Sequence, residues 1–355
     1  MKIAITADLH LKNKNSSPER YRALENLLDQ TKHLSISHLI IAGDLFDSQM
    51  RNYRDFDSVC KAPRFSDIQI YVLPGNHDIG LTNGSLTAGN VTVCDLPEII
   101  RFDLMSLPIL MVPYHEEKNM GEEIEPFAHE LESNHWILVG HGDWIFGMQE
   151  PNPLEPGVYM PLTRTDVASY QPAQVILGHI HKSMDEGIVH YPGSLMPLDI
   201  NETGKRRILI LDSETGQVES QPIASEIIYL NESITVLPVE DEISMITRRI
   251  DSILEKYQLT EQEMKRSVIR FKISGYSKDK RKLAEFLSTR LGTFKFYKDE
   301  GVNLDDVYLA DDPDKNEVAG RVMMKIKDFT WQRREHDPGK NQIVLEALHT
   351  IYGGN

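Results

Sequence analysis

The sequence is poor in cysteine, since its 355 residues include only Cys60 and Cys94, which form no CxxC pair. This scarcity argues against a disulfide framework and against a thiolate metal site, and predicts a reduced, cytoplasmic protein. The sequence also lacks any run of about 18 apolar residues, so we expect no membrane span. The opening residues, MKIAITADLH, contain the acidic Asp8 and lack the apolar core of a signal peptide.

Positive charge is also scarce, because 38 Lys and Arg stand against 54 Asp and Glu, which gives a net charge of −16. That balance argues against an independent nucleic-acid-binding protein. The scarcity is uneven, however, because residues 265–298 contain 11 basic and 2 acidic residues, a local charge of +9. In a chain that is otherwise acidic, this basic segment is either an ordinary solvated face or a surface that contacts phosphate.

Short apolar runs rich in Ile, Val and Leu recur in the first part of the chain and are typical of strands buried on both faces. Between the first two runs, Pro18 can begin a helix that carries Tyr21, Leu24 and Leu28 on one face. Strand, helix and strand in this order predict a layered α/β domain, which we place at residues 1–229. The runs are KIAIT, HLIIA, IQIYVL, HWILV, QVIL and RRILIL.

The length of the chain exceeds the usual size of one domain, and the pattern changes after residue 229. Residues 230–310 predict a small α+β domain. Its expected elements are helices near 242–257 and 278–291 and strands at 268–273 and near 293–298.

The last part of the chain, residues 311–355, begins with the acidic stretch ADDPDKNE, which is typical of a linker. The run NQIVLEALHTIY follows, with apolar residues at helical spacing, and predicts a helix at 341–352. Such a helix either packs on its own domain or binds a partner.

Polar residues with ligand chemistry follow the apolar runs at their carboxyl ends, where the loops of an open α/β sheet converge. A single His at a strand end usually has a structural role. Many ionisable groups buried together would be very costly without a compensating cation, so the full set predicts a metal centre. The set is Asp8, His10, Asp44, Asp47, Asn76, His77, Asp78, His141, His179 and His181.

Mixed imidazole and carboxylate ligands without thiolate favour Mn²⁺, Fe²⁺ or Zn²⁺ over all-oxygen Mg²⁺ or Ca²⁺ sites. The candidates exceed what one ion requires, whereas two ions that share a bridging carboxylate would use them fully. Such a pair clamps a phosphate oxygen and activates water at neutral pH, which is the chemistry of phosphoester hydrolysis. We therefore expect two divalent ions, Mn²⁺ first, with Mg²⁺, Zn²⁺ and Fe²⁺ as alternatives.

The motifs DLH, GDLFD, GNHD, GHG and GHIH, in this order, resemble those of the calcineurin-like metallophosphoesterase superfamily across residues 1–215. Within it, the GDLFD form, the spacing and a second domain make the chain most similar to the SbcD family, nuclease subunits of complexes that process DNA double-strand breaks. The resemblance implies a layered metallophosphoesterase sandwich with a smaller α+β capping domain and a C-terminal partner-binding tail.

The resemblance also assigns roles to the polar set. His77 falls at the family's catalytic position, where it would protonate the leaving oxygen or stabilise the transition state. Asp47 and Asp78 are expected to orient ligands; eukaryotic and archaeal relatives generally carry His where this chain has Asp47. The implied ligands are Asp8, His10, Asp44 and His181 for one ion, and Asp44, Asn76, His141 and His179 for the other.

These inferences together predict a metal-dependent DNA nuclease, exonuclease or endonuclease, that acts in DNA repair, recombination or replication. Because the acidic first domain would repel DNA, we expect phosphate contacts from the basic segment. The candidate residues are Lys265, Arg266, Arg270, Lys272, Lys278, Lys280, Arg281 and Lys282.

The resemblance implies two kinds of protein partner, a coiled-coil ATPase of the SbcC type and a second copy that dimerises through the phosphoesterase domain. Two other functions remain open. The first is a phosphodiesterase or phosphatase that acts on small nucleotides with the same two metals. The second is a catalytically silent scaffold, which the presence of every expected ligand argues against.

Overall fold

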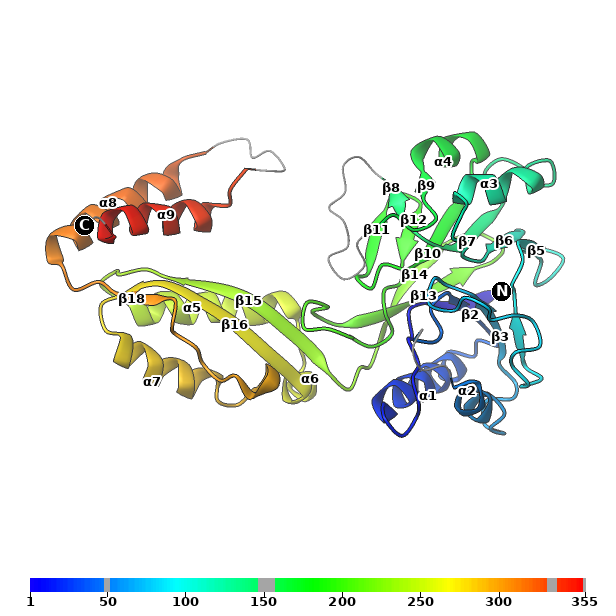
Figure 1. Ribbon diagram of the computed structural model, residues 1–355, viewed down its shortest axis with the longest axis horizontal. Helices are drawn as coiled ribbons and strands as arrows, with labels where there is room; N and C mark the ends of the chain where they lie inside the picture. Colours follow the sequence, from blue (N-terminus) through cyan, green and yellow to red (C-terminus); the bar gives the residue numbers. More distant parts are fainter. Residues whose placement is uncertain (48–51, 146–156, 331–336, 354–355) are drawn as a thin grey trace. The chain divides into compact units, whose positions relative to one another are not determined.

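The computed structural model describes residues 1–47, 52–145, 157–330 and 337–353 (Figure 1). The chain divides into two compact units. The first unit comprises Met1–Leu198 and Lys205–Glu226, and the second comprises Asp199–Gly204 and Ile227–Asn355. None of the helices in the described part of the chain combines the length and the apolar character that crossing a membrane requires.

The first unit contains two six-stranded sheets. In one sheet β1 to β4 lie side by side in sequence order, and each is parallel to its neighbour. Beyond β1 the sheet continues with β13, which is antiparallel to β1, and then β14, which is antiparallel to β13. The strands are β1 (Lys2–Thr6), β2 (His38–Ala42), β3 (Gln69–Leu73), β4 (Val91–Val93), β13 (Arg206–Asp212) and β14 (Val218–Ile223).

The other sheet has the order β11-β12-β10-β7-β6-β5, in which β12, β10, β7 and β6 are parallel and the two edge strands are antiparallel. Its strands are β5 (Glu98–Ile100), β6 (Ile109–Val112), β7 (Ile137–His141), β10 (Gln174–Gly178), β11 (Met184–Glu186) and β12 (Val189–Tyr191). The short β8 (Trp144–Ile145) and β9 (Leu162–Thr163) pair separately.

The two sheets stack, and helices cover their outer faces. Ile3 and Ile5 of β1 pack in a core with Val139 of β7, whereas Ala4 points to the opposite face and packs with Leu24. This alternation is the period-two pattern of a strand, and it buries both faces. The helices are α1 (Pro18–His33) and α2 (Tyr53–Cys60) on one sheet, and α3 (Met120–Ile124) and α4 (Arg164–Tyr170) on the other, with η1 (Glu125–Phe127) after α3. The predicted layered α/β fold is confirmed.

The second unit is built on a sheet in which β16 (Ser267–Ser277) pairs in parallel with β15 (Ile228–Val236), β17 (Lys295–Phe296) and β18 (Val307–Leu309). Ile269, Phe271 and Ile273 alternate along β16 and pack in one core with residues of α5 (Glu242–Tyr257) and α7 (Lys280–Leu291). The short α6 (Glu261–Arg266) precedes β16, and η2 (Tyr297–Asp299) follows β17. The helices and strands expected here are present within a few residues of their predicted bounds.

The prediction of a linker after residue 310 is wrong, because this stretch begins α8 (Pro313–Asp328). Asp312 is the N-cap and its side chain accepts the N–H groups of Asp314 and Lys315. Acidic residues are favourable there because they cap free N–H groups at the positive end of the helix dipole. The acidic run is therefore a helix start.

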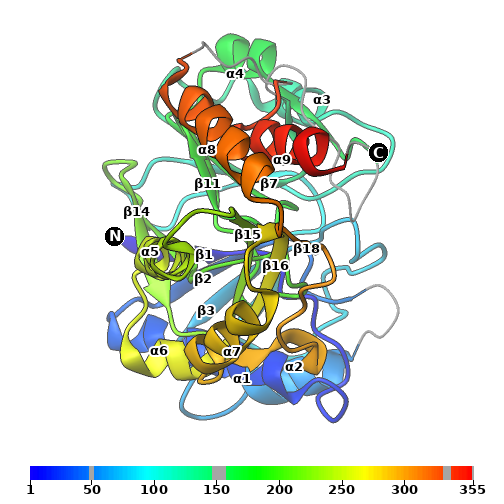
Figure 2. The ribbon, with the colours of Figure 1, turned by 90° about the vertical axis from the view of Figure 1, so that its left-hand side faces the viewer.

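The predicted terminal helix is present as α9 (Lys340–Tyr352), and it lies beside α8 (Figure 2). We call α8 and α9 together the C-terminal hairpin. Leu348 of α9 and Ala319 of α8 are fully buried in a cluster with Tyr276 of β16. The hairpin therefore packs on its own unit through one of its faces.

Candidate metal centre

The loops that carry the polar motifs meet at one edge of the stacked sheets. Gly178 at the end of β10 pairs directly with His141 at the end of β7. After β1 and β2 the two loops remain side by side, because the His10 N–H donates to the Asp44 carbonyl over 2.9 Å. The carboxyl ends of parallel strands converge in this way at ligand-binding edges.

The backbone at this edge adopts an uncommon conformation. Four of the candidate residues have positive φ angles, namely Asp8 (54°), His10 (45°), Asp44 (50°) and His179 (98°). For residues with a side chain such a conformation costs on the order of 1–3 kcal/mol and tends to be retained at functional sites. The fold holds these four residues there through the hydrogen bonds of the surrounding loops.

Two glycines of the motifs leave room for the polar cluster. A Cβ at Gly43 would lie 1.9 Å from His141 Nδ1, and a Cβ at Gly75 would lie 2.2 Å from Asp44 Oδ1. Real Cβ atoms do not approach other atoms so closely. The glycine in front of Asp44 and the one in front of Asn76 are therefore needed for the side chains to come together.

Within the described residues, three overlapping groups of side chains bring their ligand atoms within 4.8 Å of one another. His10 belongs to two of the groups and Asp44 to two, so the three form one continuous cluster. The groups are Asp8, His10 and His181; His10, Asp44 and His77; and Asp44, His141 and His179.

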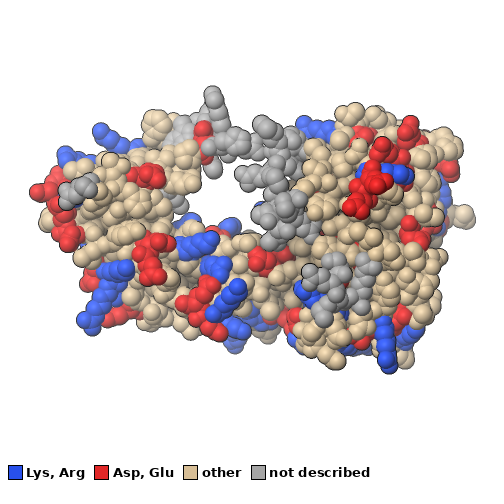
Figure 3. Space-filling view, viewed as in Figure 1, with Lys and Arg blue, Asp and Glu red and all other residues tan. Residues whose placement is uncertain are grey.

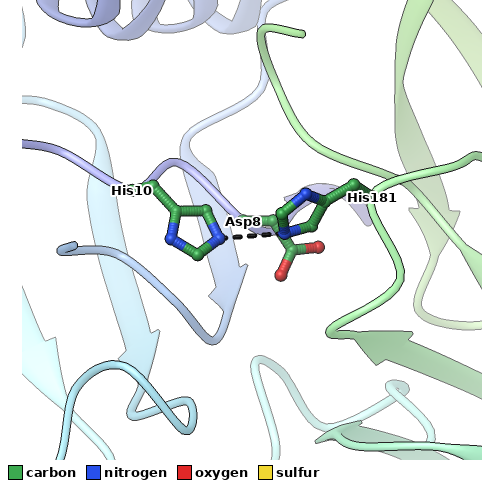
Figure 4. Close-up of side chains that lie close together, drawn as sticks. All are labelled: Asp8, His10 and His181. Atoms are coloured by element: carbon green, nitrogen blue, oxygen red, sulfur yellow. Dashed lines mark hydrogen bonds between the residues drawn. The ribbon is translucent and has the colours of Figure 1, made fainter. Parts of the chain in front are cut away.

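In one half of the cluster, two imidazoles face each other above a carboxylate. His10 Nε2 lies 3.0 Å from His181 Nε2 and 3.6 Å from Asp44 Oδ2. Figure 4 shows the carboxylate of Asp8 beside the two rings. Three ligand atoms from two separate loops, those of Asp8, His10 and His181, therefore gather around one point, and Asp44 adjoins them through His10.

In the other half, Asn76 and Asp44 lie between two further imidazoles. His141 Nε2 lies 2.9 Å from Asn76 Oδ1 and 3.4 Å from Asp44 Oδ2, and His179 Nδ1 lies 3.2 Å from Asn76 Oδ1. The other nitrogen of His141, Nδ1, lies 2.9 Å from the Ala42 carbonyl and so carries a proton. This hydrogen bond directs Nε2 toward the cluster.

The chemistry of the cluster fits divalent metal ions. The side chains of Asp8 and Asp44 are inaccessible to solvent. The Oδ2 atom of each has no hydrogen-bond partner among the described residues. Buried carboxylate oxygens are costly unless a cation or a donor compensates them. Imidazole, carboxylate and amide oxygen without thiolate form a donor set suited to Mn²⁺, Fe²⁺ or Zn²⁺.

Protonation of the cluster follows from burial and from its internal charges. Burial lowers the pKa of His10 to about 3 and raises the pKa of Asp8 to about 6. Burial alone would lower the pKa of His141, but the adjacent Asp44 raises it to about 9. Metal ligands must be deprotonated, so an ion that binds here displaces the proton that this raised pKa keeps on His141.

His77 belongs to one of the three groups of this cluster and is half-buried. Its backbone N–H donates to Asp44 Oδ1 over 2.9 Å, and its ring stands edge-on to His10 at 4.7 Å between centroids. The imidazole is therefore close to the candidate ligands while part of it still reaches solvent, which is compatible with the catalytic role expected from the sequence.

Asp47 and Asp78 do not join the three ligand groups. Asp78 accepts the N–H groups of Leu45, Phe46 and Gly75, and so ties the loop after β2 to the loop after β3. Asp47 lies 3.3 Å from Lys12 Nζ and 3.9 Å from Arg20 Nη1. Arg20 in turn donates to the carbonyl of His10. The contacts of Asp78 and those of Asp47 agree with the orienting role expected for these two carboxylates.

Three further residues approach the cluster and were not predicted. Asp143 lies two positions after His141, with Oδ1 3.7 Å from His179 Nε2. Tyr159 places its ring 4.7 Å from that of His179, between centroids. The buried Arg206 donates to the carbonyl of His181 over 3.0 Å. Of these, only Asp143 could have been suspected from the sequence, as a carboxylate close to a motif.

The eight basic candidates do not form one cluster. Lys265 and Arg266 precede β16, whereas the lysines and arginine from Lys278 to Lys282 follow it. Because β16 has 11 residues and a strand rises by about 3.3 Å per residue, the two groups lie roughly 30 Å apart. Figure 3 shows acidic and basic side chains interspersed over the visible face of this unit.

The comparisons with known proteins agree with this geometry. The model of the calcineurin-like phosphoesterase family matches residues 1–183, so the chain belongs to that family. Its members are metal-dependent phosphoester hydrolases with a site for two divalent ions, and the clustered ligands lie where such a site is expected. No curated protein matches the sequence significantly.

Solved structures that resemble the chain include three from different organisms. They are TT1561 of Thermus thermophilus (12% identity, TM-score 0.39, 63% of this chain and 99% of that one), GAP50, the anchor in the inner membrane complex of Plasmodium (10%, 0.40, 63% and 89%), and a dimetal phosphatase from Danio rerio (10%, 0.35, 63% and 99%). Because these TM-scores are low, the family assignment rests on the family model alone.

Proposed function

We propose that the protein is a DNA nuclease of the SbcD type, which hydrolyses phosphodiester bonds at a dinuclear metal centre. The observation that carries this proposal is the convergence of the ligand atoms of Asp8, Asp44 and the surrounding imidazoles at one sheet edge. A second unit with exposed lysines supports a polyanionic substrate over a small one.

Two divalent ions would be held by the halves of the cluster. Asp8, His10 and His181 would bind one, and Asn76, His141 and His179 would bind the other, with Asp44 shared between them. Bound there, such ions supply Lewis-acid stabilisation of the phosphate and a nucleophile at neutral pH.

The chain itself contributes orientation and a proton donor. The N–H of His77 holds Asp44 Oδ1, which leaves Oδ2 directed toward both His10 and His141. The half-buried imidazole of His77 would give a proton to the departing sugar oxygen, so that this oxygen does not leave as an alkoxide.

A comparison of substrates tests the proposed specificity. Turnover of end-labelled duplex DNA, a chromogenic phosphodiester and a mononucleotide would be measured with Mn²⁺. We expect hydrolysis of DNA and of the chromogenic diester, with little release of phosphate from the mononucleotide. Preferred hydrolysis of the mononucleotide would instead support the alternative function, a phosphatase or phosphodiesterase acting on small nucleotides.

Phosphate contacts by the second unit give a prediction of their own. Lys265, Lys272 and Lys278 are exposed and form no ion pair among the described residues, whereas Arg270 is paired with Glu300. Reversing these three lysines to glutamate should weaken DNA binding and flatten its salt dependence. The expected change is about 0.9 in the slope of log K against log salt for each lysine that contacts a phosphate.

This prediction is checked by fluorescence anisotropy at several salt concentrations. The matched control reverses three lysines of the first unit, Lys2, Lys61 and Lys118, each of which is paired with an acidic residue. If both triple variants keep the slope of the wild type, the three lysines of the second unit do not contact phosphate.

We also propose a coiled-coil ATPase of the SbcC type as partner of the C-terminal hairpin, and a homodimer formed by the phosphoesterase domain. Val318 and Met324 of the hairpin and Phe329, the C-cap of α8, are 40%, 62% and 61% exposed, although Leu348 of the hairpin is fully buried. Apolar side chains left outside in this way are typical of a surface that a partner covers.

Substitution of Met324 and Phe329 by glutamate should therefore abolish co-purification with such an ATPase and leave metal binding unchanged. A double substitution of exposed glutamates on α5 and α7, Glu255→Lys and Glu285→Lys, serves as the control. Retention of the partner by the Met324 and Phe329 variant would contradict a role of the hairpin in docking.

A further inference from the structure

His179 has a contact with a residue outside the proposed ligand set, namely Asp143. Its backbone N–H donates to Asp8 Oδ1 over 3.0 Å, and its Nδ1 faces Asn76 inside the cluster. The second ring nitrogen, Nε2, lies 3.7 Å from Asp143 Oδ1. Asp143 belongs to none of the three ligand groups. Nε2 of His179 therefore lies near a carboxylate that is not one of the candidate ligands.

Asp143 is itself fixed in place by the chain. Its Oδ2 accepts the N–H of Tyr159 over 2.7 Å, and its backbone N–H donates to the Tyr159 carbonyl over 2.8 Å. Its own carbonyl accepts the N–H of Leu162 over 2.8 Å. Two hydrogen bonds thus hold the backbone of Asp143 and one holds its carboxylate, whose other oxygen, Oδ1, is the one near His179.

Tyr159 adds a second restraint on the same imidazole. Its ring lies against that of His179, with centroids 4.7 Å apart and planes inclined at 42°. The imidazole is therefore limited in rotation by an aromatic face while one of its nitrogens is directed at a carboxylate. Both restraints come from the segment between β7 and β9, which contributes none of the predicted ligands.

We propose that Asp143 is a positioning residue for the metal centre. At 3.7 Å its Oδ1 is beyond direct hydrogen-bond distance of Nε2, but its negative charge favours the proton of His179 on that nitrogen and so leaves the lone pair of Nδ1 available to an ion. A metal-ligating imidazole commonly donates its other N–H to a carboxylate, which selects the tautomer and increases ligand basicity. This inference rests on the proposed dinuclear centre and adds to it a residue outside the five motifs.

Replacement of Asp143 by asparagine should reverse the tautomer preference of His179. The single side-chain oxygen of asparagine is needed by the Tyr159 N–H, so the amide NH₂ group would face Nε2 of His179. A donor in that position favours the tautomer with the proton on Nδ1, which is the nitrogen that should bind the ion. We therefore expect the affinity for one of two Zn²⁺ ions to fall about 10- to 100-fold.

The experiment measures Zn²⁺ affinity and stoichiometry by competition with a chromogenic chelator, for the wild type, Asp143→Asn and Asp143→Glu. In parallel, ¹⁵N-histidine spectra of the Zn²⁺-loaded proteins report the Nε2–H proton of His179, assigned by its absence from His179→Gln. We expect this proton downfield in the wild type, shifted upfield in Asp143→Asn, and partly restored in Asp143→Glu. Thermal unfolding of the metal-free proteins should be the same for all three.

Asp185→Asn is the matched control, because Asp185 Oδ1 lies 2.7 Å from Nδ1 of His190 in a histidine–aspartate pair outside the three ligand groups. It should not change Zn²⁺ affinity. Unchanged affinity in Asp143→Asn, or weaker binding without a shift of the Nε2–H proton, would overturn the proposal, and so would complete loss of one ion, which would make Asp143 a ligand. If the wild type binds fewer than two ions, the proposed function fails first, and separately.

Discussion

Substitution of Asp44 by asparagine should reduce hydrolysis of a phosphodiester at least about a thousandfold, which corresponds to about 4 kcal/mol of transition-state stabilisation. Asp44 belongs to two of the three ligand groups, and its buried Oδ2 lies 3.6 Å from His10 Nε2 and 3.4 Å from His141 Nε2. Asparagine preserves the shape and an acceptor for the His77 N–H. It removes the negative charge that both ions would share, so both should bind more weakly.

Metal-linked stability provides a measurement independent of activity. An ion present at about 100 times its dissociation constant stabilises the folded state by about 2.7 kcal/mol. For a unit of this size that amounts to roughly 5–10 °C in Tm. Calorimetry with Mn²⁺ and with a chelator should show this increase for the wild type and little of it for Asp44→Asn.

Asp57→Asn is the control for loss of a buried carboxylate. Asp57 is buried and accepts the N–H groups of Thr87 and Ala88, and it belongs to none of the ligand groups. This variant should lose stability but retain the increase in Tm on metal addition. If Asp44→Asn binds two ions with the affinity of the wild type, Asp44 does not bridge them.

Substitution of His77 by asparagine should lower hydrolysis by about 10²- to 10⁴-fold while both ions remain bound. His77 lies in a group with His10 and Asp44, but its ring is edge-on to His10, and its hydrogen bond to Asp44 Oδ1 comes from the backbone N–H, which asparagine retains. Loss of the imidazole therefore removes a proton donor and leaves the neighbouring ligands in place.

Metal stoichiometry and single-turnover hydrolysis together test this role. His190→Asn is the matched control, because His190 is also half-buried and bonds to Asp185 and Gln174 away from the ligand groups. It should behave like the wild type. Undiminished hydrolysis by His77→Asn would exclude a catalytic role, and loss of an ion would identify His77 as a ligand.

The layered fold and the meeting of the polar motifs could be predicted from the sequence. Apolar runs such as KIAIT and HLIIA are buried on both faces, and a parallel arrangement brings their carboxyl ends to one edge. Asp8 and Asp44 are therefore neighbours although they lie far apart in the sequence. The order of five motifs was sufficient to indicate the family to which the chain belongs.

Charge and composition alone did not describe the local geometry of two segments in the second unit. Charge density alone grouped residues 265–298 as one basic segment, but β16 separates Lys265 and Arg266 from the basic residues that follow it. The chain then returns along β17, where Lys295 pairs with Val268 near the start of β16. The run ADDPDKNE was interpreted as a linker because it is acidic, yet the same residues cap α8 and occupy its first turn. Composition does not distinguish a solvated linker from a helix start.

By itself the sequence determined which residues could bind metal, because imidazole and carboxylate chemistry belongs to the residue type and strand ends follow from apolar periodicity. Only the tertiary structure decided which groups orient those ligands. Asp143, Tyr159 and Arg206 act on His179 and His181 through contacts between segments distant in the sequence. Such contacts depend on how loops return to the sheet edge, and no local pattern of residues encodes that path.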